Sequence, residues 1–185
     1  MKKNIRYALI LLTICAVSTF FLALTNSITA PIIEEMDIQA RLKALEAVSN
    51  GLEIGEQQDV DGVHFVSYQI DLSDGGNPAG WILGLKTNGY GGEMTLVASY
   101  TLDGVMQYAQ LLNHSETPGL GKKAEEGWYM EKFKNTGGSN PVPTTKAMLS
   151  AGDAQAVSGS SVTFTAIAKA IAAGSNYVKS LGGAL

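Results

Sequence analysis

Val157-Ser158-Gly159-Ser160-Ser161-Val162-Thr163 (VSGSSVT) is the stretch that decides how the C-terminal part of the chain folds. Small hydroxyl residues surround a glycine here, and an apolar pattern typical of a helix follows from Ser161 to about Lys179. The unpaired backbone N–H groups at a helix N-terminus favour an anion, and hydroxyls in the first turn lie within bonding reach of it. The stretch is therefore either an ordinary serine-rich N-cap or a site that binds, or covalently holds, a phosphate.

A long apolar run lies at the other end of the chain. Residues 7–24 read YALILLTICAVSTFFLAL without a charge, and with their flanks they reach the roughly 20 residues that a helix needs to cross a bilayer. Basic residues precede this run and an acidic segment follows it. The positive-inside rule then predicts a single-pass protein of the cytoplasmic (inner) membrane. The expected parts are a cytoplasmic stub at 1–6, a transmembrane helix at 7–25 and an extracytoplasmic domain on the outer face at 26–185.

Other interpretations of the run fit less well. It is longer than the apolar region of a cleavable signal peptide, and no A-x-A pattern closes it. Bulky residues precede Cys15 in the middle of the run, which argues against a lipoprotein anchor there. Because Cys15 is the single cysteine, an intramolecular disulfide and an all-cysteine iron–sulfur site within this chain are excluded. A net charge of −4 without a basic patch argues against a nucleic-acid partner.

The residues between these two ends predict an α+β domain. Apolar residues at helical spacing indicate an amphipathic helix that lies against the outer domain and ends near Asn50-Gly51. Its apolar positions are Ile38, Leu42, Leu45 and Val48. Alternating and β-rich segments then predict strands, with a hairpin at Asp103-Gly104. The expected strands are His64–Ile70, Gly80–Thr87, Glu93–Leu102, Val105–Leu112 and a further one near Val142–Leu149. The fold class is therefore antiparallel strands with flanking helices, joined to one transmembrane helix.

A second unusual segment is His114-Ser115-Glu116-Thr117-Pro118-Gly119-Leu120-Gly121 (HSETPGLG). Its Pro-Gly pair makes a tight loop with exposed backbone amides. Such a loop is either a plain turn after a strand or a lid on a planar, hydrogen-bonding ligand.

Gly89-Tyr90-Gly91-Gly92, a hairpin, HSETPGLG and then SGSSVT before a helix follow the order seen in a known family. The chain resembles the FMN-binding domain of the Rnf complex G subunit, and that of its relative, the C subunit of the sodium-translocating NADH:quinone reductase. The resemblance covers nearly the whole chain, membrane helix included. HSETPGLG is its more specific motif and is closer to the Rnf version.

The resemblance implies a covalently attached FMN. In that family an Asp, two variable residues and then S/T-G-A-T or S/T-G-A-S precede the C-terminal helix, and the last hydroxyl residue is linked to the FMN phosphate. Ser158-Gly159-Ser160-Ser161 overlays this motif, so Ser161 is the expected acceptor. The chain departs from the pattern with Ser as acceptor, with Ser160 in place of Ala, and with Gln155 in place of Asp, while Asp153 lies two residues earlier. Thr163 is the alternative acceptor, and a site without a covalent link is the third alternative.

Further residues are placed near the flavin by the same resemblance. Those expected along the ring are Glu116, Thr117, Leu120 and Gly121. Lys146 either stabilises negative charge on reduced flavin or is an ordinary surface lysine. Trp128 and Tyr90 either pack on the ring or fill the core, and the core is the expected place for Tyr90.

The implied function is electron transfer by a redox subunit of a translocase that exchanges electrons between NADH and ferredoxin and couples this to Na⁺ or H⁺ transport. The implied partners are the A, B, C, D and E type subunits and a flavin transferase for maturation. No G-x-G-x-x-G follows a strand, so this chain is not expected to bind NADH or a substrate by itself. His64 and His114 do not suggest a metal site, and no G-x-S-x-G elbow suggests a hydrolase. The alternatives are the quinone-reductase C subunit and a non-redox, membrane-anchored sensor module that holds a ligand at HSETPGLG.

Overall fold

The structure is a computed structural model that describes residues 2–182, with side chains from Asn4 onward. Met1 of the expected stub, and the side chains of Lys2 and Lys3, lie outside the described residues. The chain divides between Arg41 and Leu42 into two compact units, each of which is described by itself.

The N-terminal unit is formed by most of α1, a helix over Lys2–Ser49. Within the described part of the chain, this is one helix with the length and composition of a membrane span. Pro31 lies inside it and has no N–H to give to the preceding turn, yet the helix continues. Hydroxyls of Thr25 and Thr29 donate to carbonyl groups four residues earlier at 2.9 and 3.0 Å, so these polar side chains are satisfied within the helix itself.

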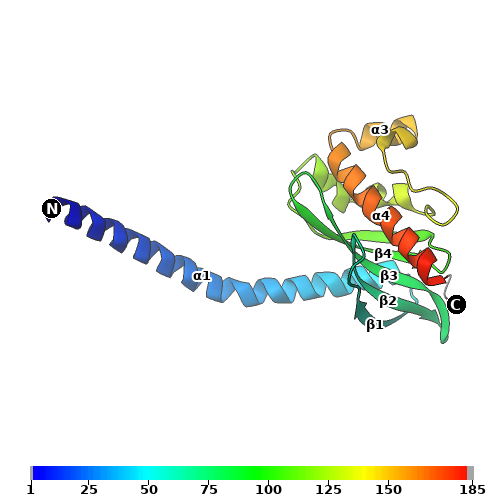
Figure 1. Cartoon of the computed structure of the whole chain (residues 1–185), viewed down its shortest axis with the longest axis horizontal. Coiled ribbons are helices and arrows are strands. Elements are labelled where there is room, and N and C mark those ends of the chain that lie inside the picture. The colour runs from blue at the N-terminus through cyan, green and yellow to red at the C-terminus, as the bar shows by residue number, and fades with distance from the viewer. Residues whose placement is uncertain (1, 183–185) are drawn as a thin grey trace. The chain divides into compact units, whose positions relative to one another are not determined.

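The second unit is built on a five-stranded antiparallel sheet in the simple order β1-β2-β3-β4-β5 (Figure 1). The strands are β1 (Glu53–Asp59), β2 (Val66–Asp74), β3 (Asn77–Asn88), β4 (Glu93–Thr101) and β5 (Met106–Asn113). β3 and β4 pair without a register shift from Gly80↔Thr101 to Asn88↔Glu93. Gly104, with φ of 77°, lies in the predicted hairpin between β4 and β5. Four of the five expected strands are therefore confirmed, with shifted ends.

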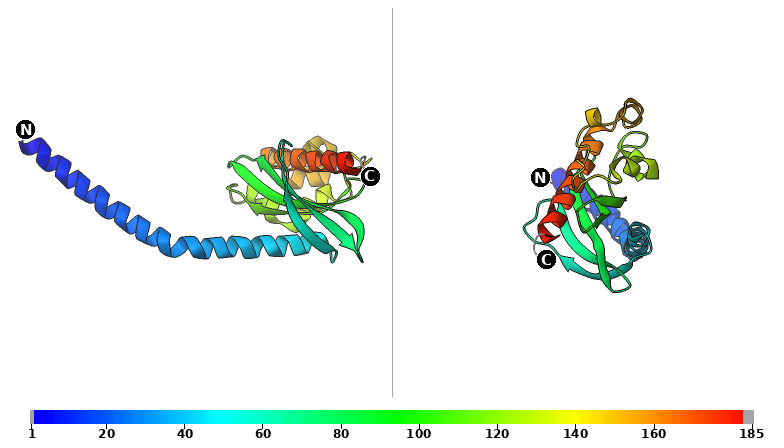
Figure 2. Two further views of the ribbon diagram at one scale, coloured as in Figure 1. Left: turned by 60° about the horizontal axis from the view of Figure 1, so that its bottom comes forward. Right: turned by 90° about the vertical axis from the view of Figure 1, so that its right-hand side faces the viewer.

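Helix α4 (Ser161–Gly182) lies along one face of this sheet, as Figure 2 shows. Its buried side chains join those of β3, β4 and β5 in the larger core. Two hydrogen bonds reach from the sheet to α4 carbonyl groups: Tyr100 Oη to Ile171 at 3.0 Å and Thr87 Oγ1 to Ala166 at 3.2 Å. Because both donors are buried, breaking these bonds would cost free energy, so they fix the position of α4 along the sheet.

The opposite face of the sheet carries a smaller core. Ala44, Leu45 and Val48, at the C-terminal end of α1, pack in one cluster with apolar residues of the sheet. The sheet residues are Ile70, Leu72, Ile82 and Val97. The expected amphipathic helix is thus confirmed over this last part, whereas Ile38 and Leu42 stay exposed.

Short helical turns connect β5 to α4. They are η1 (Gly121–Glu125), α2 (Gly127–Met130), η2 (Glu131–Phe133), η3 (Lys146–Met148) and α3 (Ala151–Ala156). The strand expected near Val142–Leu149 is therefore wrong: the segment holds a 3₁₀ turn and irregular backbone. Pro141 and Pro143 lack the N–H groups that a strand in a ladder needs, which explains the failure.

Candidate functional site

The site begins at the turn between α3 and α4. Ser150 caps α3 by accepting a hydrogen bond from the Asp153 backbone N–H at 3.2 Å. Gly159 takes a φ of 85°, a left-handed conformation that suits glycine, and the chain reverses into α4. Ser160 is buried, and its hydroxyl donates to the Val157 carbonyl oxygen at 2.9 Å. This inward-facing serine holds the turn, so it is part of the structure that supports Ser161.

The first turn of α4 presents free backbone donors. The N–H of Ser160 donates to Val157 and that of Phe164 donates to Ser160. No acceptor within residues 2–182 takes the N–H groups of the three residues between them, which begin at Ser161. These are the unpaired donors that a helix N-terminus offers to an anion.

A second wall comes from the loop after β5. Leu120 N and Lys122 N both donate to the Thr117 carbonyl oxygen, at 3.1 and 3.2 Å, which closes the Pro-Gly turn. The Glu116 N–H donates to His114 Nδ1 at 3.1 Å. Since Nδ1 accepts, the proton of the neutral ring lies on Nε2, which is 2.7 Å from a Glu125 carboxylate oxygen.

The two motifs meet in one pocket of about 490 Å³. Its lining comes from both, and from the glycine-rich loop between β3 and β4. The lining residues are Tyr90, Glu116, Thr117, Leu120, Gly121, Gly159, Ser160, Ser161, Val162 and Thr163. The structure therefore brings together most of the residues expected at the site from segments far apart in the chain, since Glu116 and Thr163 are 47 residues apart.

The three inner hydroxyls of the helix start differ in their bonding. Ser161 is half-buried, and its hydroxyl bonds to no other described residue. Thr163 is buried and donates to Glu116 Oε2 at 2.6 Å. Ser160, besides its bond to Val157, lies 3.3 Å from the Tyr129 hydroxyl. Of the three, only Ser161 has a hydroxyl that is both in the pocket wall and uncommitted.

Tyr129 lies behind Ser160 in the core, and its hydroxyl has an unusual environment. Burial raises the pKa of Tyr129 to about 12. The hydrogen bond with Ser160 opposes this shift, and the negative charge of Glu116 adds to it. Tyr129 is thus a neutral hydrogen-bonding group at any ordinary pH. The sequence carried no motif that singled it out.

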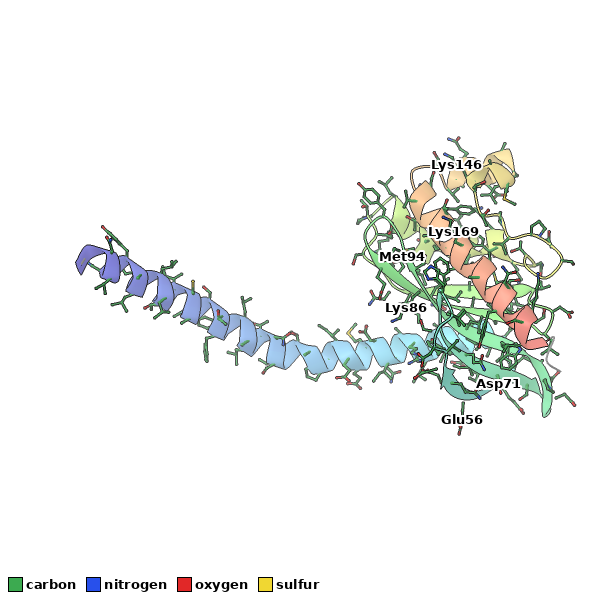
Figure 3. The ribbon with its side chains drawn as sticks, viewed as in Figure 1. Glu56, Asp71, Lys86, Met94, Lys146 and Lys169 are labelled. Carbon is green, nitrogen blue, oxygen red and sulfur yellow. The ribbon has the colours of Figure 1, made fainter. Side chains whose placement is uncertain are left out.

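Some expected residues lie elsewhere. Tyr90 is 77% exposed at the pocket mouth, so its expected place in the core is wrong; the glycine-rich loop that carries it runs over the surface. Trp128, on α2, and Ser158 do not line the pocket, and neither does Lys146 on η3. Figure 3 shows Lys146 beside α3, away from Lys169 on α4.

Lys169 was not singled out by the sequence. It lines a second pocket of about 620 Å³ that shares Ser161 and Val162 with the first. Lys169 lies eight residues after Ser161, about two helical turns further along α4 and near the same side. This spacing is the sequence signal that could have identified it.

Asp153, the carboxylate nearest to the position where the family pattern has Asp, has other partners. Its carboxylate lies 2.5 Å from Lys132 Nζ and 2.7 Å from the Ser150 hydroxyl. Lys132 also lies 5.0 Å from the centre of the Trp128 ring. The hydrogen bond from Lys132, and then that from Ser150, lower the pKa of Asp153. Asp153 therefore ties α3 to η2. No group of three His, Cys, Asp or Glu side chains that suits a metal ion occurs among the described residues.

The chain is similar to known proteins in both sequence and structure. An FMN-binding domain model matches residues 89–176, and a model of the RnfG N-terminal region matches residues 1–48. The G subunit of the Na⁺-translocating ferredoxin:NAD⁺ oxidoreductase complex of Acetobacterium woodii is 30% identical, over 92% of this chain and 89% of the relative. The G subunit of the proton-translocating complex of Clostridium ljungdahlii is 24% identical, over 85% and 82%. A crystal structure of Shewanella oneidensis NqrC aligns with 67% of this chain and 69% of its own, at 15% identity and a TM-score of 0.47.

Proposed function

Because the chain belongs to the family of G subunits of ion-translocating ferredoxin:NAD⁺ oxidoreductase (Rnf) complexes, we propose that it carries electrons on an FMN that is joined through its phosphate to Ser161. The observation that carries this proposal is the free Ser161 hydroxyl, which lies at a helix N-terminus in the wall of the pocket of Glu116.

The pocket suits a flavin in its chemistry. The FMN-binding domain match, residues 89–176, includes both the Glu116 loop and the start of α4. Glu116 offers hydrogen-bond acceptors to the pocket, and an isoalloxazine ring carries an N–H donor. Leu120 and Val162 offer apolar contact for the ring. The free N–H groups at the start of α4 and the dipole of this helix favour the negative charge of a phosphodiester at Ser161.

The bonding of the two hydroxyls favours Ser161 over Thr163 as acceptor. Thr163 is 1% exposed and its hydroxyl is held by Glu116, so a phosphate there would displace a buried hydrogen bond. A phosphate would also have to occupy the space next to a buried carboxylate. Ser161 has neither obstacle.

FMN supplies the electron transfer, and the chain's residues hold it and tune it. A covalent tether prevents loss of the cofactor in a compartment without a dependable flavin supply. The phosphodiester leaves the ring unmodified, so its reduction potential depends on hydrogen bonds and burial in the pocket. Lys146 lies outside the pocket lining and is given no role at the ring.

The membrane arrangement is part of the proposal. Residues 7–25 of α1 span the membrane, the stub at 1–6 is cytoplasmic, and 26–185 lie on the outer face, where the other Rnf subunits, of the A to E types, exchange electrons with the flavin. A flavin transferase attaches the FMN. Because Asp153 pairs with Lys132, it does not stand in for the Asp that Gln155 replaces, so this chain is expected to be flavinylated more slowly than one with Asp at 155.

A denaturing gel tests the proposal against the alternative of a non-redox sensor module. The full chain is produced with a flavin transferase, unfolded in detergent and examined for flavin fluorescence in the band. Fluorescence that stays with the denatured chain is the expected result. A colourless band from the co-expressed protein, with a known flavinylated protein as positive control, would contradict covalent attachment.

A further inference from the structure

Glu116 is a buried carboxylate without a cation. Its side chain belongs to a residue that is 6% exposed, and no ion pair joins it to a Lys, Arg or His within residues 2–182. Two neutral donors contact its oxygens: the Gly91 N–H at 2.9 Å from Oε1 and the Thr163 hydroxyl at 2.6 Å from Oε2. Carboxylates are rarely buried without a partner of opposite charge, because loss of water costs the charged form free energy.

The carboxylate is also held in one place by its surroundings. A Cβ on Gly121 would lie 2.0 Å from Oε2, and one on Gly89 would lie 2.2 Å from Oε1. The absence of a side chain at both glycines therefore leaves room for the Glu116 head group. With Thr163 on α4 and Gly91 on the β3–β4 loop, three separate segments converge on one charge. Because several segments position a carboxylate that has no cation partner, we infer that the charge itself has a function.

The charge acts on the interior of the site. Glu116 lines the pocket together with Ser161, and its negative charge contributes to the raised pKa of Tyr129 behind the helix start. The pocket wall is otherwise glycine, hydroxyl and apolar side chains, so no described cation in the lining cancels this charge. Where water is excluded, a fixed charge acts more strongly on a neighbouring charge than it does in water.

We propose that Glu116 keeps the reduction potential of the bound flavin low, and that Thr163 is the positioning residue that fixes the Glu116 carboxylate beside it. This inference rests on the proposed function, because it requires the flavin ring to occupy the pocket. Reduction adds electron density to the ring. A fixed negative charge in the same pocket opposes that addition, so the reduced form is less favoured than it would be beside a neutral side chain.

Glu116→Gln tests the role of the charge. The substitution keeps the shape and an acceptor oxygen for Gly91, and the Thr163 hydroxyl turns to accept from the new amide, so the fold is expected to persist. The midpoint potential of the covalent flavin is measured by optical redox titration of the full chain in detergent. We expect the equilibrium for one-electron reduction to shift at least tenfold toward the reduced form, which corresponds to about 59 mV upward.

Glu126→Gln is the matched control. Glu126 is an exposed carboxylate ten residues along the same segment and outside the pocket lining, so its removal should leave the potential where it was. An unchanged potential in flavin-loaded Glu116→Gln, or an equal shift in the control, overturns the proposal. Either result leaves the covalent attachment intact, so failure here differs from failure of the proposed function, which appears as a chain without flavin.

Substitutions of Thr163 test its positioning role. They also test the role of the Glu116 charge if Glu116→Gln takes up no flavin. Thr163→Ser keeps the donor and is expected to keep the wild-type midpoint potential. Thr163→Val removes the hydroxyl that holds Glu116 Oε2, so the carboxylate is no longer fixed beside the ring, and the midpoint potential is expected to rise. Equal midpoint potentials in the two variants would overturn the role of Thr163 and of the charge it holds.

Discussion

At the scale of single residues, the structure separates hydroxyls that the sequence presents as alike. Ser158, Ser160, Ser161 and Thr163 all belong to one short motif. The motif and the resemblance single out Ser161, but only the fold reveals that Thr163 bonds to Glu116, 47 residues earlier. Contacts between segments so far apart depend on how the strands turn and pair. They therefore could not be read from the spacing of the motif.

Asp153 gives a pH-dependent prediction. Its pKa is lowered from the ordinary value of 3.8 by Lys132 and Ser150, so the folded protein favours its charged form. The stabilisation is therefore present above pH 3.8 and is lost as the pH falls through the lower folded-state pKa. Asp153→Asn should lower the thermal midpoint of the full chain at pH 7, and the difference from wild type should close under acid conditions below pH 3.8.

Asp71→Asn is the control for this measurement, because Asp71 is an exposed carboxylate on β2, as Figure 3 shows. It should change the thermal midpoint little at either pH. An Asp153→Asn deficit that persists unchanged in acid would show that the carboxylate acts through something other than its charge.

At the scale of elements, hydrophobic periodicity was sufficient for α4 and for β2 to β5. It failed for β1, whose seven residues are all exposed, since such a strand has no apolar alternation to reveal it. It failed in the opposite direction near Val142–Leu149, where Pro141 and Pro143 flank Val142 and the segment pairs with none of the five strands of the described sheet. Pairing partners, more than local composition, decide whether such segments become strands.

The packing of α4 on the sheet gives a prediction at this scale. Gly174 lies against Tyr100, and a Cβ added there would be 2.4 Å from the Tyr100 hydroxyl oxygen, which bonds to Ile171. Gly174→Ala should therefore reduce the free energy of unfolding by roughly 1–3 kcal/mol, as overpacked cores do. Chemical denaturation of the full chain in detergent measures this change.

Gly152→Ala provides the comparison. Gly152 lies in α3, and an added Cβ meets nothing within 4 Å, so alanine is expected to be neutral or slightly stabilising by its helix propensity. If both substitutions reduce the free energy of unfolding equally, the close packing of α4 against Tyr100 is not the reason that alanine destabilises position 174.

At the scale of the whole molecule, the apolar run and its charged flanks predict which side of the membrane each part occupies. Ser139→Cys, made in a Cys15→Ser background, places one thiol at an exposed position of the globular unit. A membrane-impermeant maleimide should label this thiol in intact cells, because 26–185 are expected outside. Labelling only after the cells are broken open would reverse the orientation.

Family membership and the geometry of the site together lead us to expect that Ser161 carries the flavin. The direct measurement is peptide mass spectrometry of residues 147–169 from chains produced with a flavin transferase. We expect an FMN-sized adduct on Ser161 that is absent from Ser161→Ala and retained by Ser158→Ala, whose serine lies outside the pocket lining. A full adduct in Ser161→Ala, with its mass located on Thr163, would contradict the assignment of Ser161 as the flavin acceptor.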